Sequence, residues 1–268
     1  MSINSRRFVF VLLIAAMGIP GCASPPIAPS PDVRKLLAPT GTLRLGLSQG
    51  TPGQMIRDPS TGEIRGIGYE LGREFARRLG VPFEVVVIQG NAQFIEAMQS
   101  GRVDFGSNNA TPARAMHMSF AQPHLEVEAG YLVSSTSKIS AIAEVDREGV
   151  RVGVTQGSTS EARFSQELKH AVLTRAPSIA AAEKMLASGQ VDVFATNKGN
   201  LFDMSDRLPG SRVLDGRYGV EQVSLAIPKG RELGMPFLRQ FVEDAKSTGL
   251  VAAAAQRAGL RGLALESK

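Results

Sequence analysis

The side chain best suited to bind an anion in this sequence is an arginine at the start of a predicted helix. Thr111 and Pro112 have the pattern of an N-cap followed by the first helical residue, because a threonine hydroxyl accepts a backbone N–H and proline has none to lose. Arg114 then falls in the first turn, beside N–H groups without helical partners. A guanidinium next to free N–H donors can hold a carboxylate bidentately. An ordinary helix start with a solvated arginine has the same spacing, so both interpretations stay open here.

A second place that suits an anion follows a later predicted strand. Residues 156–159 form a loop that enters a helix, and Ser158 and Glu161 have capping-box spacing. The free N–H groups and the dipole at such a helix start favour a negative charge, with Gly157 at the turn.

The surrounding pattern alternates between strands and helices in two similar halves. The first half has predicted strands at 42–47, 82–88 and 103–105, and helices that begin at 68 and 94. The second half has strands at 150–154 and 191–195, and helices at 178–187 and from 201. Strands at 131–133 and 223–227 connect the halves, and helices at 231–247 and 250–258 close the chain.

This order predicts an α/β protein with two lobes and a cleft between them. We expect a discontinuous first lobe, residues 40–132 plus 224–268, and a second lobe of residues 133–223, with the two connecting strands as a hinge. Ligands of such sheets sit at the carboxyl ends of the strands. Three loops meet that description: 49–53, 107–114 and 156–159.

The N-terminus has the pattern of an export signal. Arg6 and Arg7 precede an apolar run at 8–17 that is short for a membrane span, which predicts a signal peptide at residues 1–21. Cys22 is the only cysteine and follows a small residue, as in a bacterial lipoprotein, although a plain secretory peptide cut just after it fits as well. We expect a periplasmic protein held to the membrane by lipid on Cys22, with an extended Pro/Ser/Ala-rich tether at 22–39.

The composition is that of an ordinary globular protein and argues against several partners. The 268 residues are 43% hydrophobic and 21% charged. Removing the signal peptide leaves 28 basic and 25 acidic residues, a net charge of +3 that is spread out, so we expect no nucleic-acid partner. The three histidines are far apart and no cluster has metal-ligand spacing, so neither a metal nor another cofactor is expected.

The order and spacing of several short segments resemble the family 3 extracellular solute-binding proteins of ABC transporters, the amino-acid-binding group with a two-lobed periplasmic fold. The resemblance covers roughly residues 40–262. No single segment is specific, but their order is. The segments are Leu43-Arg44-Leu45-Gly46, Gly66-Ile67-Gly68-Tyr69-Glu70-Leu71, Ser100-Gly101-Arg102-Val103-Asp104, Thr111-Pro112-Ala113-Arg114, Phe120-Ala121-Gln122-Pro123-His124, Val152-Gly153-Val154 with Gly157, and Gly189-Gln190-Val191-Asp192.

The resemblance implies a monomeric binding protein that delivers a small carboxylate-bearing solute to an ABC transporter permease. It implies that Arg114 grips the ligand carboxylate with the help of Thr111, and that Gly157 and Ser158 donate amides to the same group from the second lobe. Ser107 lies in the predicted ligand loop 107–114, together with Arg114 and Thr111.

The departures from the family pattern bear on the solute. The family's sandwiching aromatic residues are missing near Gly50 and near Asn91, and Asn109 stands where a threonine often binds the ligand. Asn197 stands where an acidic residue pairs with the ligand's α-ammonium group. A neutral amide cannot offset a buried cation. The sequence therefore favours a small carboxylate or a weakly cationic polar solute over a standard amino acid.

Two alternatives share this fold. Some dehydratases of cyclic carboxylates do, and Glu70 or Glu96 could then serve as the general acid, although both positions are ordinary for helix starts and solvated faces. A ligand-sensing module is the other alternative, but no apolar span follows toward Lys268. A dinucleotide motif at 66–72 and a hydrolase motif at 46–50 lack the required strand–turn–helix context. We expect a binding protein and not an enzyme.

Overall fold

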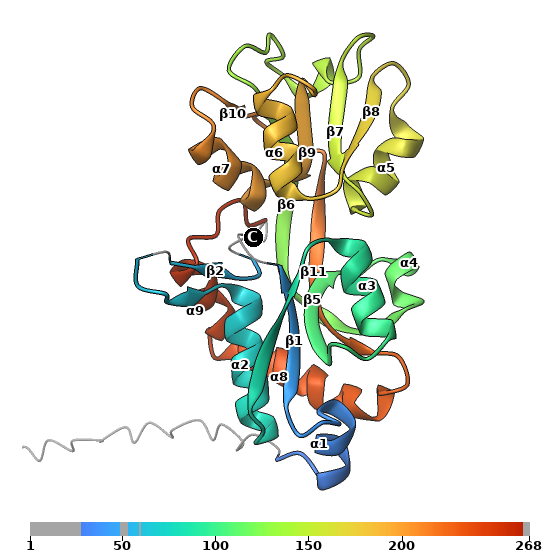
Figure 1. Cartoon of the computed structure of the whole chain (residues 1–268), viewed down its shortest axis with the longest axis vertical. Helices are drawn as coiled ribbons and strands as arrows, with labels where there is room; N and C mark the ends of the chain where they lie inside the picture. The colour runs from blue at the N-terminus through green and yellow to red at the C-terminus, as the bar shows by residue number, and fades with distance from the viewer. Residues whose placement is uncertain (1–27, 49–52, 59, 265–268) are drawn as a thin grey trace, which may run out of the picture.

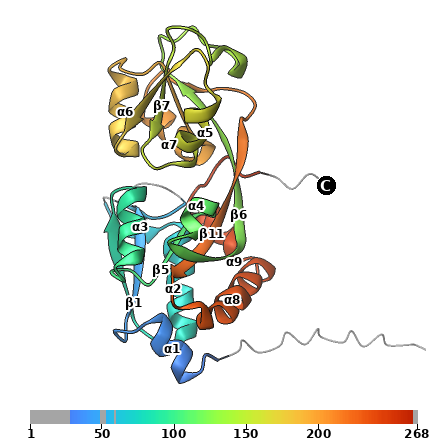
Figure 2. The same cartoon turned by 90° about the vertical axis from the view of Figure 1, so that its right-hand side faces the viewer.

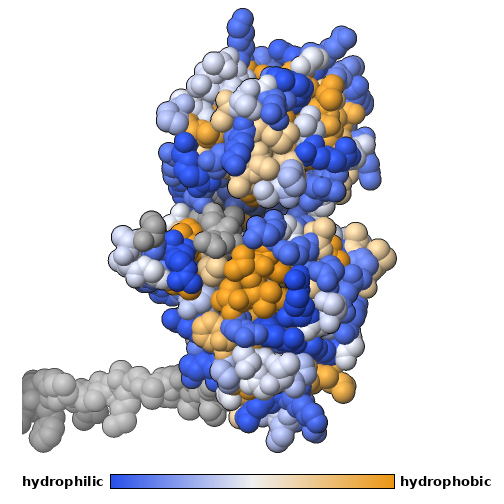
Figure 3. All heavy atoms as spheres, in the orientation of Figure 1, coloured by the Kyte–Doolittle hydropathy of each residue, from blue (hydrophilic) through white to orange (hydrophobic). Residues whose placement is uncertain are grey.

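The computed structural model describes residues 28–48, 53–58 and 60–264, and places them in two α/β lobes stacked along the long axis of the molecule (Figure 1). In the space-filling view the lobes are two rounded bodies that meet at a waist (Figure 3). One mixed sheet runs through both lobes, in the strand order β4-β1-β5-β11-β6-β9-β7-β8, with β10 paired to β6. The predicted two-lobed α/β fold is confirmed.

Lobe 1 contains three parallel strands with helices on both faces. The strands are β1 (Leu43–Ser48), β4 (Phe83–Ile88) and β5 (Phe105–Asn109). The helices are α1 (Pro31–Leu37), α2 (Ile67–Leu79), α3 (Asn91–Gln99), α4 (Pro112–Ala115), α8 (Met235–Ser247) and α9 (Leu250–Arg257), with a 3-10 turn at Glu232–Gly234 and a hairpin of β2 (Ile56–Arg57) and β3 (Ile64–Arg65).

Lobe 2 repeats this plan. Its strands are β7 (Arg151–Thr155), β8 (Val172–Ala176), β9 (Val193–Asn197) and the short β10 (Arg212–Val213). Its helices are α5 (Thr159–Glu167), α6 (Ile179–Ala187) and α7 (Lys198–Arg207), with a 3-10 turn at Ile142–Glu144. β7 lies between β8 and β9 and is parallel to both.

Two antiparallel strands join the lobes, β6 (Met118–Val133) and β11 (Gly219–Pro228), as Figure 2 shows. β6 is much longer than the strand expected at 131–133. The expected strand was short because Pro123 interrupts the apolar alternation in the sequence. The structure accommodates this proline with register shifts on either side of Ser224, which it faces. A proline can lie in a strand at such an irregularity, since the missing N–H then breaks no regular ladder.

In each lobe, each face of the sheet has its own apolar core, and strand alternation assigns residues to these cores. In β11, Leu225 and Ile227 face the core under α2, α8 and α9, whereas Ala226 faces the core under α3. In β6, Tyr131 and Val133 pack toward α5, whereas Leu132 packs toward α6 and α7. The side-chain period of two residues places these neighbours on opposite faces.

The tether predicted for residues 22–39 is wrong over its second part, because residues 31–37 form α1. Ser30 caps this helix by accepting the N–H of Val33, and Pro31 occupies the first helical position. Leu37 is fully buried in the lobe 1 core against Gly234, where a Cβ atom would lie 2.5 Å from the leucine side chain. The Pro/Ser-rich composition hid a helix start, since serine and then proline are the residues that begin helices.

The predicted signal peptide, Cys22 and the loop near Gly50 lie outside the described residues. No helix in the described part of the chain is long and apolar enough to cross a membrane. Over the same residues, no group of three or more His, Cys, Asp or Glu side chains is arranged to hold a metal ion.

Candidate functional site

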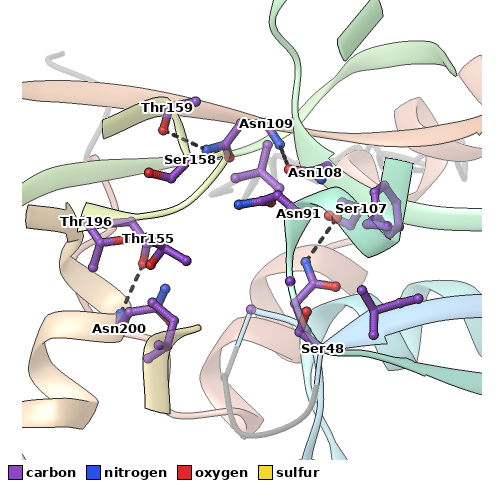
Figure 4. Close-up of a pocket in the computed structure, with 18 of the residues that line it drawn as sticks. Ser48, Asn91, Ser107, Asn108, Asn109, Thr155, Ser158, Thr159, Thr196 and Asn200 are labelled. Carbon is purple, nitrogen blue, oxygen red and sulfur yellow. Dashed lines mark hydrogen bonds between the residues drawn. The ribbon is translucent and has the colours of Figure 1, made fainter. Parts of the chain in front are cut away.

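A cavity of about 280 Å³ lies between the lobes, against the two hinge strands (Figure 4). This volume is near the lower end of the range for small-molecule sites, roughly 300–1,000 Å³. Half of its lining residues are neutral and polar. The polar residues that line it are Ser48, Gln54, Gln89, Asn91, Ser107, Asn108, Asn109, Arg114, Thr155, Ser158, Thr159, Ser178, Thr196, Asn197, Asn200 and Glu221.

The cavity lies where the architecture gathers strand and helix ends. Ser48 ends β1 and Thr155 ends β7, so the two lobes present equivalent strand ends to it. The first residues of α3, α5 and α6 also line it, and so do the N-cap and the third residue of α7. The N-terminus of each helix carries a partial positive charge. The lining is therefore favourable for an anionic group before any charged side chain is considered.

Arg114 is the only cationic side chain among the described residues that line the cavity. It is 5% exposed. One terminal nitrogen, Nη1, donates to Asn108 Oδ1 at 2.7 Å and to the Asn109 carbonyl at 3.2 Å, while Nη2 donates to the Gly157 carbonyl of lobe 2 at 3.0 Å. All three acceptors are neutral oxygens, so no carboxylate among the described residues hydrogen-bonds directly to this guanidinium.

Burial lowers the pKa of Arg114, and the negative charge of Glu221 opposes that shift. The ordinary pKa of arginine is high enough that the group stays charged at neutral pH. The site thus holds a buried positive charge whose hydrogen-bond partners are uncharged, which is a suitable partner for a ligand carboxylate.

Thr111 holds Arg114 in place rather than lining the cavity. The predicted cap is confirmed, since the Thr111 hydroxyl accepts the Arg114 N–H at 3.3 Å and α4 begins at Pro112. Thr111 is not among the cavity-lining residues. The prediction of direct contact between Thr111 and the ligand therefore has no support in the geometry, whereas its effect on the backbone of Arg114 does.

Gly157 also differs from the prediction. Its N–H, expected to reach the ligand, donates to Glu161 Oε2 at 2.5 Å, and Glu161 is held in turn by Arg175. The Gly157 carbonyl accepts from Arg114, and Gly157 does not line the cavity. The capping spacing of Ser158 and Glu161 did foretell a cap: Ser158 accepts the Glu161 N–H at 3.0 Å. In a full capping box the Glu161 carboxylate would accept the backbone N–H of Ser158, but here it accepts the N–H of Gly157, one residue earlier.

Five other predicted residues do line the cavity: Asn91, Ser107, Asn109, Ser158 and Asn197. Asn109 donates from Nδ2 to the Thr159 hydroxyl at 3.4 Å, which connects the lobes (Figure 4). Asn197 caps α7, because its Oδ1 accepts the Asn200 N–H at 3.0 Å. Three of the five carry amides, and Gln54, Gln89, Asn108 and Asn200 add four more, so the lining is rich in neutral amides.

Two buried hydroxyls in the lining have no hydrogen-bond partner among the described residues. Ser107 lies in lobe 1 and is 4% exposed, and Thr155 lies in lobe 2 and is 7% exposed. An unpaired buried polar group is costly, by about 1–3 kcal/mol. A solute between the lobes could satisfy one hydroxyl from each side.

The sequence reasoning missed Glu221, and it included Thr159 only as the last residue of the predicted ligand loop 156–159. Glu221 lines the cavity from β11, and its carboxylate accepts a short hydrogen bond from the Thr159 hydroxyl. The signal was present in the alternation of β11, where Glu221 and Val223 line the cavity while Val220 and Gln222 are exposed. The strand was predicted to begin at 223, so this face was not considered.

The acids suggested for an enzyme lie elsewhere. Glu70 pairs with Arg257 and Glu96 pairs with Arg102 at 3.0 Å, and neither glutamate lines the cavity. Ser48 of the hydrolase-like motif does line it, but it ends a strand.

The fold and the site define a two-lobed binding protein with a polar cleft. The pattern of the bacterial extracellular solute-binding proteins, family 3, matches residues 43–257, and this chain belongs to that family. An extracellular family agrees with the predicted export.

Two curated relatives are similar in sequence. The ABC transporter glutamine-binding protein GlnH of Bacillus subtilis is 24% identical over 204 residues, which is 72% of each chain. The glutamine-binding protein of Geobacillus stearothermophilus is 23% identical over 178 residues, 65% of this chain and 68% of the relative.

Solved structures share the fold. A mutant of the arginine-binding protein ArgBP from T. maritima has a TM-score of 0.74 at 20% identity, over 84% of this chain and 98% of that one. The solute receptor for L-cysteine of Neisseria gonorrhoeae has a TM-score of 0.74 at 23% identity, over 84% and 92%. The ancestral amino acid-binding protein AncCDT-1, a precursor of cyclohexadienyl dehydratase, has a TM-score of 0.72 at 23% identity, over 84% and 98%.

Proposed function

We propose that this protein is the substrate-binding component of an ABC importer, and that it captures an amino acid or a closely related small carboxylate in the cleft between its lobes. The observation that carries the proposal is the buried guanidinium of Arg114, held by neutral oxygens, in a cavity of about 280 Å³ lined from both lobes. The amino-acid specificities in the names of the relatives support the same class of solute.

In this proposal the solute carboxylate docks on Arg114 first, because that arginine and its cap belong to lobe 1. Lobe 2 then closes by bending of β6 and β11, and brings the starts of α5, α6 and α7 to the solute. The Arg114–Gly157 and Asn109–Thr159 hydrogen bonds already cross the cleft. The closed form would be the shape that a membrane permease recognises.

The unpartnered hydroxyls of Ser107 and Thr155 fit the second part of this mechanism. One comes from each lobe, so a polar solute that bonds to both would favour the closed state over the open one. A ligand shifts a conformational equilibrium only by its difference in affinity for the two states.

The proposal includes export, a lipid anchor on Cys22, a monomeric state and the division into residues 40–132 plus 224–268 and 133–223. The core clusters support most of that division, since residues 225–227 pack in lobe 1 and Val133 packs in lobe 2. Tyr131 and Leu132 also pack in lobe 2, which moves the first boundary to just before residue 131.

Binding without turnover separates this proposal from the dehydratase alternative. The AncCDT-1 neighbour keeps that alternative relevant, but the two glutamates suggested as general acids lie outside the cavity. A binding protein would release its solute chemically unchanged after denaturation, as judged by mass spectrometry. Conversion of the solute would instead favour an enzyme.

Replacing Arg114 by alanine tests the site itself. We expect binding to weaken by about 1.5–3 kcal/mol, because a charge-assisted bidentate contact is lost. Isothermal titration with amino acids that stabilise the wild type measures this change. Arg102→Ala is the matched control, since Arg102 is a half-exposed lobe 1 arginine outside the cavity. Unchanged affinity in Arg114→Ala would show that the carboxylate binds elsewhere.

A further inference from the structure

The cavity between the lobes contains two charges of opposite sign among the described residues that line it. Arg114 supplies the positive one and Glu221 the negative one, while the remaining lining is neutral. The two charges are close enough to influence each other, but no hydrogen bond joins them in the described part of the structure. The lining therefore offers a solute one positive and one negative group that are not hydrogen-bonded to each other.

Glu221 projects into the cavity from the hinge itself. It lies opposite Val127 of β6, and Val127, Leu125 and Val223 form the apolar surface around it. The Thr159 hydroxyl of α5 donates to Oε1, and Thr159 accepts from Asn109 in turn. No hydrogen bond to Oε2 is present among the described residues. One carboxylate oxygen is thus fixed in position and the other is left to accept a donor.

Asn197, at the position expected for a cation-binding acid, cannot take that role. It carries no charge, and its Oδ1 already caps α7 by accepting the Asn200 N–H. A solute ammonium group placed there would be buried without a counter-charge, which costs far more than a neutral polar group. Glu221 is the one carboxylate in the described lining that could offset it.

We propose that Glu221 binds the cationic group of the solute, so that the acid which recognises an ammonium group comes from hinge strand β11 instead of the end of β9. The solute is then a zwitterion, with its carboxylate at Arg114 and its ammonium at Glu221. This inference rests on the proposed function and deepens it. It also replaces the expectation that the cavity prefers a small carboxylate or a weakly cationic polar solute over a standard amino acid.

Glu221 could instead act as a positioning residue that only holds Thr159 and the start of α5. The two roles differ in one measurable respect. A cation-binding carboxylate acts only on solutes that carry an amino group. A positioning carboxylate changes the affinity for every solute that the site binds.

The experiment compares wild type and Glu221→Gln on matched pairs of probes by isothermal titration. The pairs are L-glutamine with glutaramate, L-arginine with 5-guanidinopentanoate, and L-cysteine with 3-mercaptopropionate, so that the members of a pair differ only in the amino group. We expect wild type to prefer the zwitterion of at least one pair. In Glu221→Gln the affinity for that zwitterion should fall about 10- to 100-fold, while the affinity for its partner stays constant or rises.

Glu126→Gln is the matched control. Glu126 lies on the outer face of the same hinge ladder, opposite Gln222, and its carboxylate accepts from that residue at 3.1 Å. The Glu126→Gln substitution removes the same charge from the same pair of strands without touching the cavity. The affinities of this variant for the probes should therefore equal those of wild type.

The outcomes separate the two proposals. An equal change for both members of a pair, or no change in Glu221→Gln, would overturn the role of Glu221 and leave the proposed function standing. Wild-type preference for the deaminated members would overturn it as well. If neither the zwitterions nor their partners bind wild type, the proposed function fails and this inference fails with it.

Discussion

At the scale of single residues, the treatment of buried charge separates binding positions from structural ones. Asp104 is fully buried, and its carboxylate is ion-paired to Arg44 and Arg231. Arg114 is buried to nearly the same degree but meets only amide and carbonyl oxygens. A buried ion pair is already satisfied, whereas a buried cation among neutral acceptors gains further from an anionic partner. This difference marks Arg114 as the position that a ligand completes.

Another buried polar residue, His124, predicts a pH dependence. Burial, assisted by the positive charge of Lys246 on α8, lowers the pKa of His124 to about 4, and no group in the described residues bonds to its Nδ1. The unfolded chain takes up this proton near pH 6.5, so between about pH 6.5 and 4 the unfolded state binds more protons than the folded one. The free energy of unfolding should therefore decrease as the pH is lowered through that window, and at pH 5 it should be about 2 kcal/mol lower than at pH 7.

Urea denaturation of wild type and His124→Leu at pH 7 and pH 5 measures this effect. Other groups titrate in the same range, so the informative quantity is the difference between the two proteins. The loss between the two pH values should be about 2 kcal/mol smaller in His124→Leu. An identical loss would show that His124 does not resist protonation in the folded state.

Site features that depend only on adjacent residues could be predicted from the residue types in the sequence. The Thr111 cap and the placement of Arg114 in the first turn follow from three adjacent residues. The partner of the Gly157 N–H depends on a choice of rotamer by Glu161, and the role of Glu221 depends on a strand pairing with β6. Those contacts depend on geometry that spacing alone does not specify.

At the scale of elements, the two lobes use the same device to join neighbouring parallel strands. Arg44 at the start of β1 donates its N–H and its guanidinium to Asp104, just before β5. Arg151 at the start of β7 does the same to Asp192, just before β9. Both aspartates follow a Ser-Gly-x-Val segment. The strand pairs β1–β5 and β7–β9 are thereby fixed in equivalent ways.

The same device should have different energies in the two lobes. Asp104 is fully buried beside Arg44 and Arg231, whereas the Asp192 side chain is 33% exposed and its partner Arg151 is 42% exposed. Asp104→Ala should lower the free energy of unfolding by about 3–5 kcal/mol, because two arginines lose their buried counter-charge. Asp192→Ala should cost only about 1 kcal/mol, because solvent screens the exposed pair.

Urea denaturation of both variants at neutral pH gives the comparison, with circular dichroism as the probe of secondary structure. Each variant serves as the control of the other, since the motif and the substitution are the same. Equal costs would mean that burial does not set the strength of this contact.

Elements with strong local signals were predicted from the sequence, and those that depend on distant partners were not. The helix predicted to begin at residue 68 is α2, which begins at Ile67 and buries Leu71, Phe75 and Leu79 at helical spacing. β8 was missed because its exposed edge position gives a weak apolar pattern. The first part of β6 was missed because Pro123 is tolerated only through its pairing with β11.

At the scale of the whole molecule, a third segment accompanies the two hinge strands. Residues 260–264 run beside β6: Leu263 bridges Val127, and the Glu128 N–H donates to the Gly262 carbonyl at 2.8 Å. The same segment touches lobe 2, where Arg261 pairs with Asp206 at 2.6 Å and stacks over Phe202 of α7. It therefore follows lobe 1 helix α9 and attaches to both the hinge and lobe 2.

The order of elements was enough to predict two lobes and a cleft between their strand ends. It could not predict this third segment, because residues 260–264 have no strand pattern of their own and gain their conformation from β6 and α7. For the same reason the sequence did not predict that Leu260 and Glu221 line the cavity, since both reach it only in the assembled fold.

The third segment should influence closure, and two glycines allow a matched test. Gly262 has a φ of +74°, and a Cβ atom there would lie 2.4 Å from the Lys198 side chain at the start of α7. Gly259 has a φ of +65°, but a Cβ atom there would meet nothing within 4 Å. Alanine at either position costs about 1 kcal/mol of backbone strain, while only Gly262→Ala also forces the segment away from lobe 2.

We therefore expect Gly262→Ala to weaken solute binding several-fold relative to Gly259→Ala, at matched losses of overall stability, because the lobes are no longer held by this segment in the closed arrangement. Isothermal titration with the same zwitterionic probe measures the affinities, and small-angle X-ray scattering compares the radius of gyration with and without the probe. The closed form should be less populated in Gly262→Ala when the probe is subsaturating. Equal affinities and equal scattering for the two variants would show that β6 and β11 alone control the movement of the lobes.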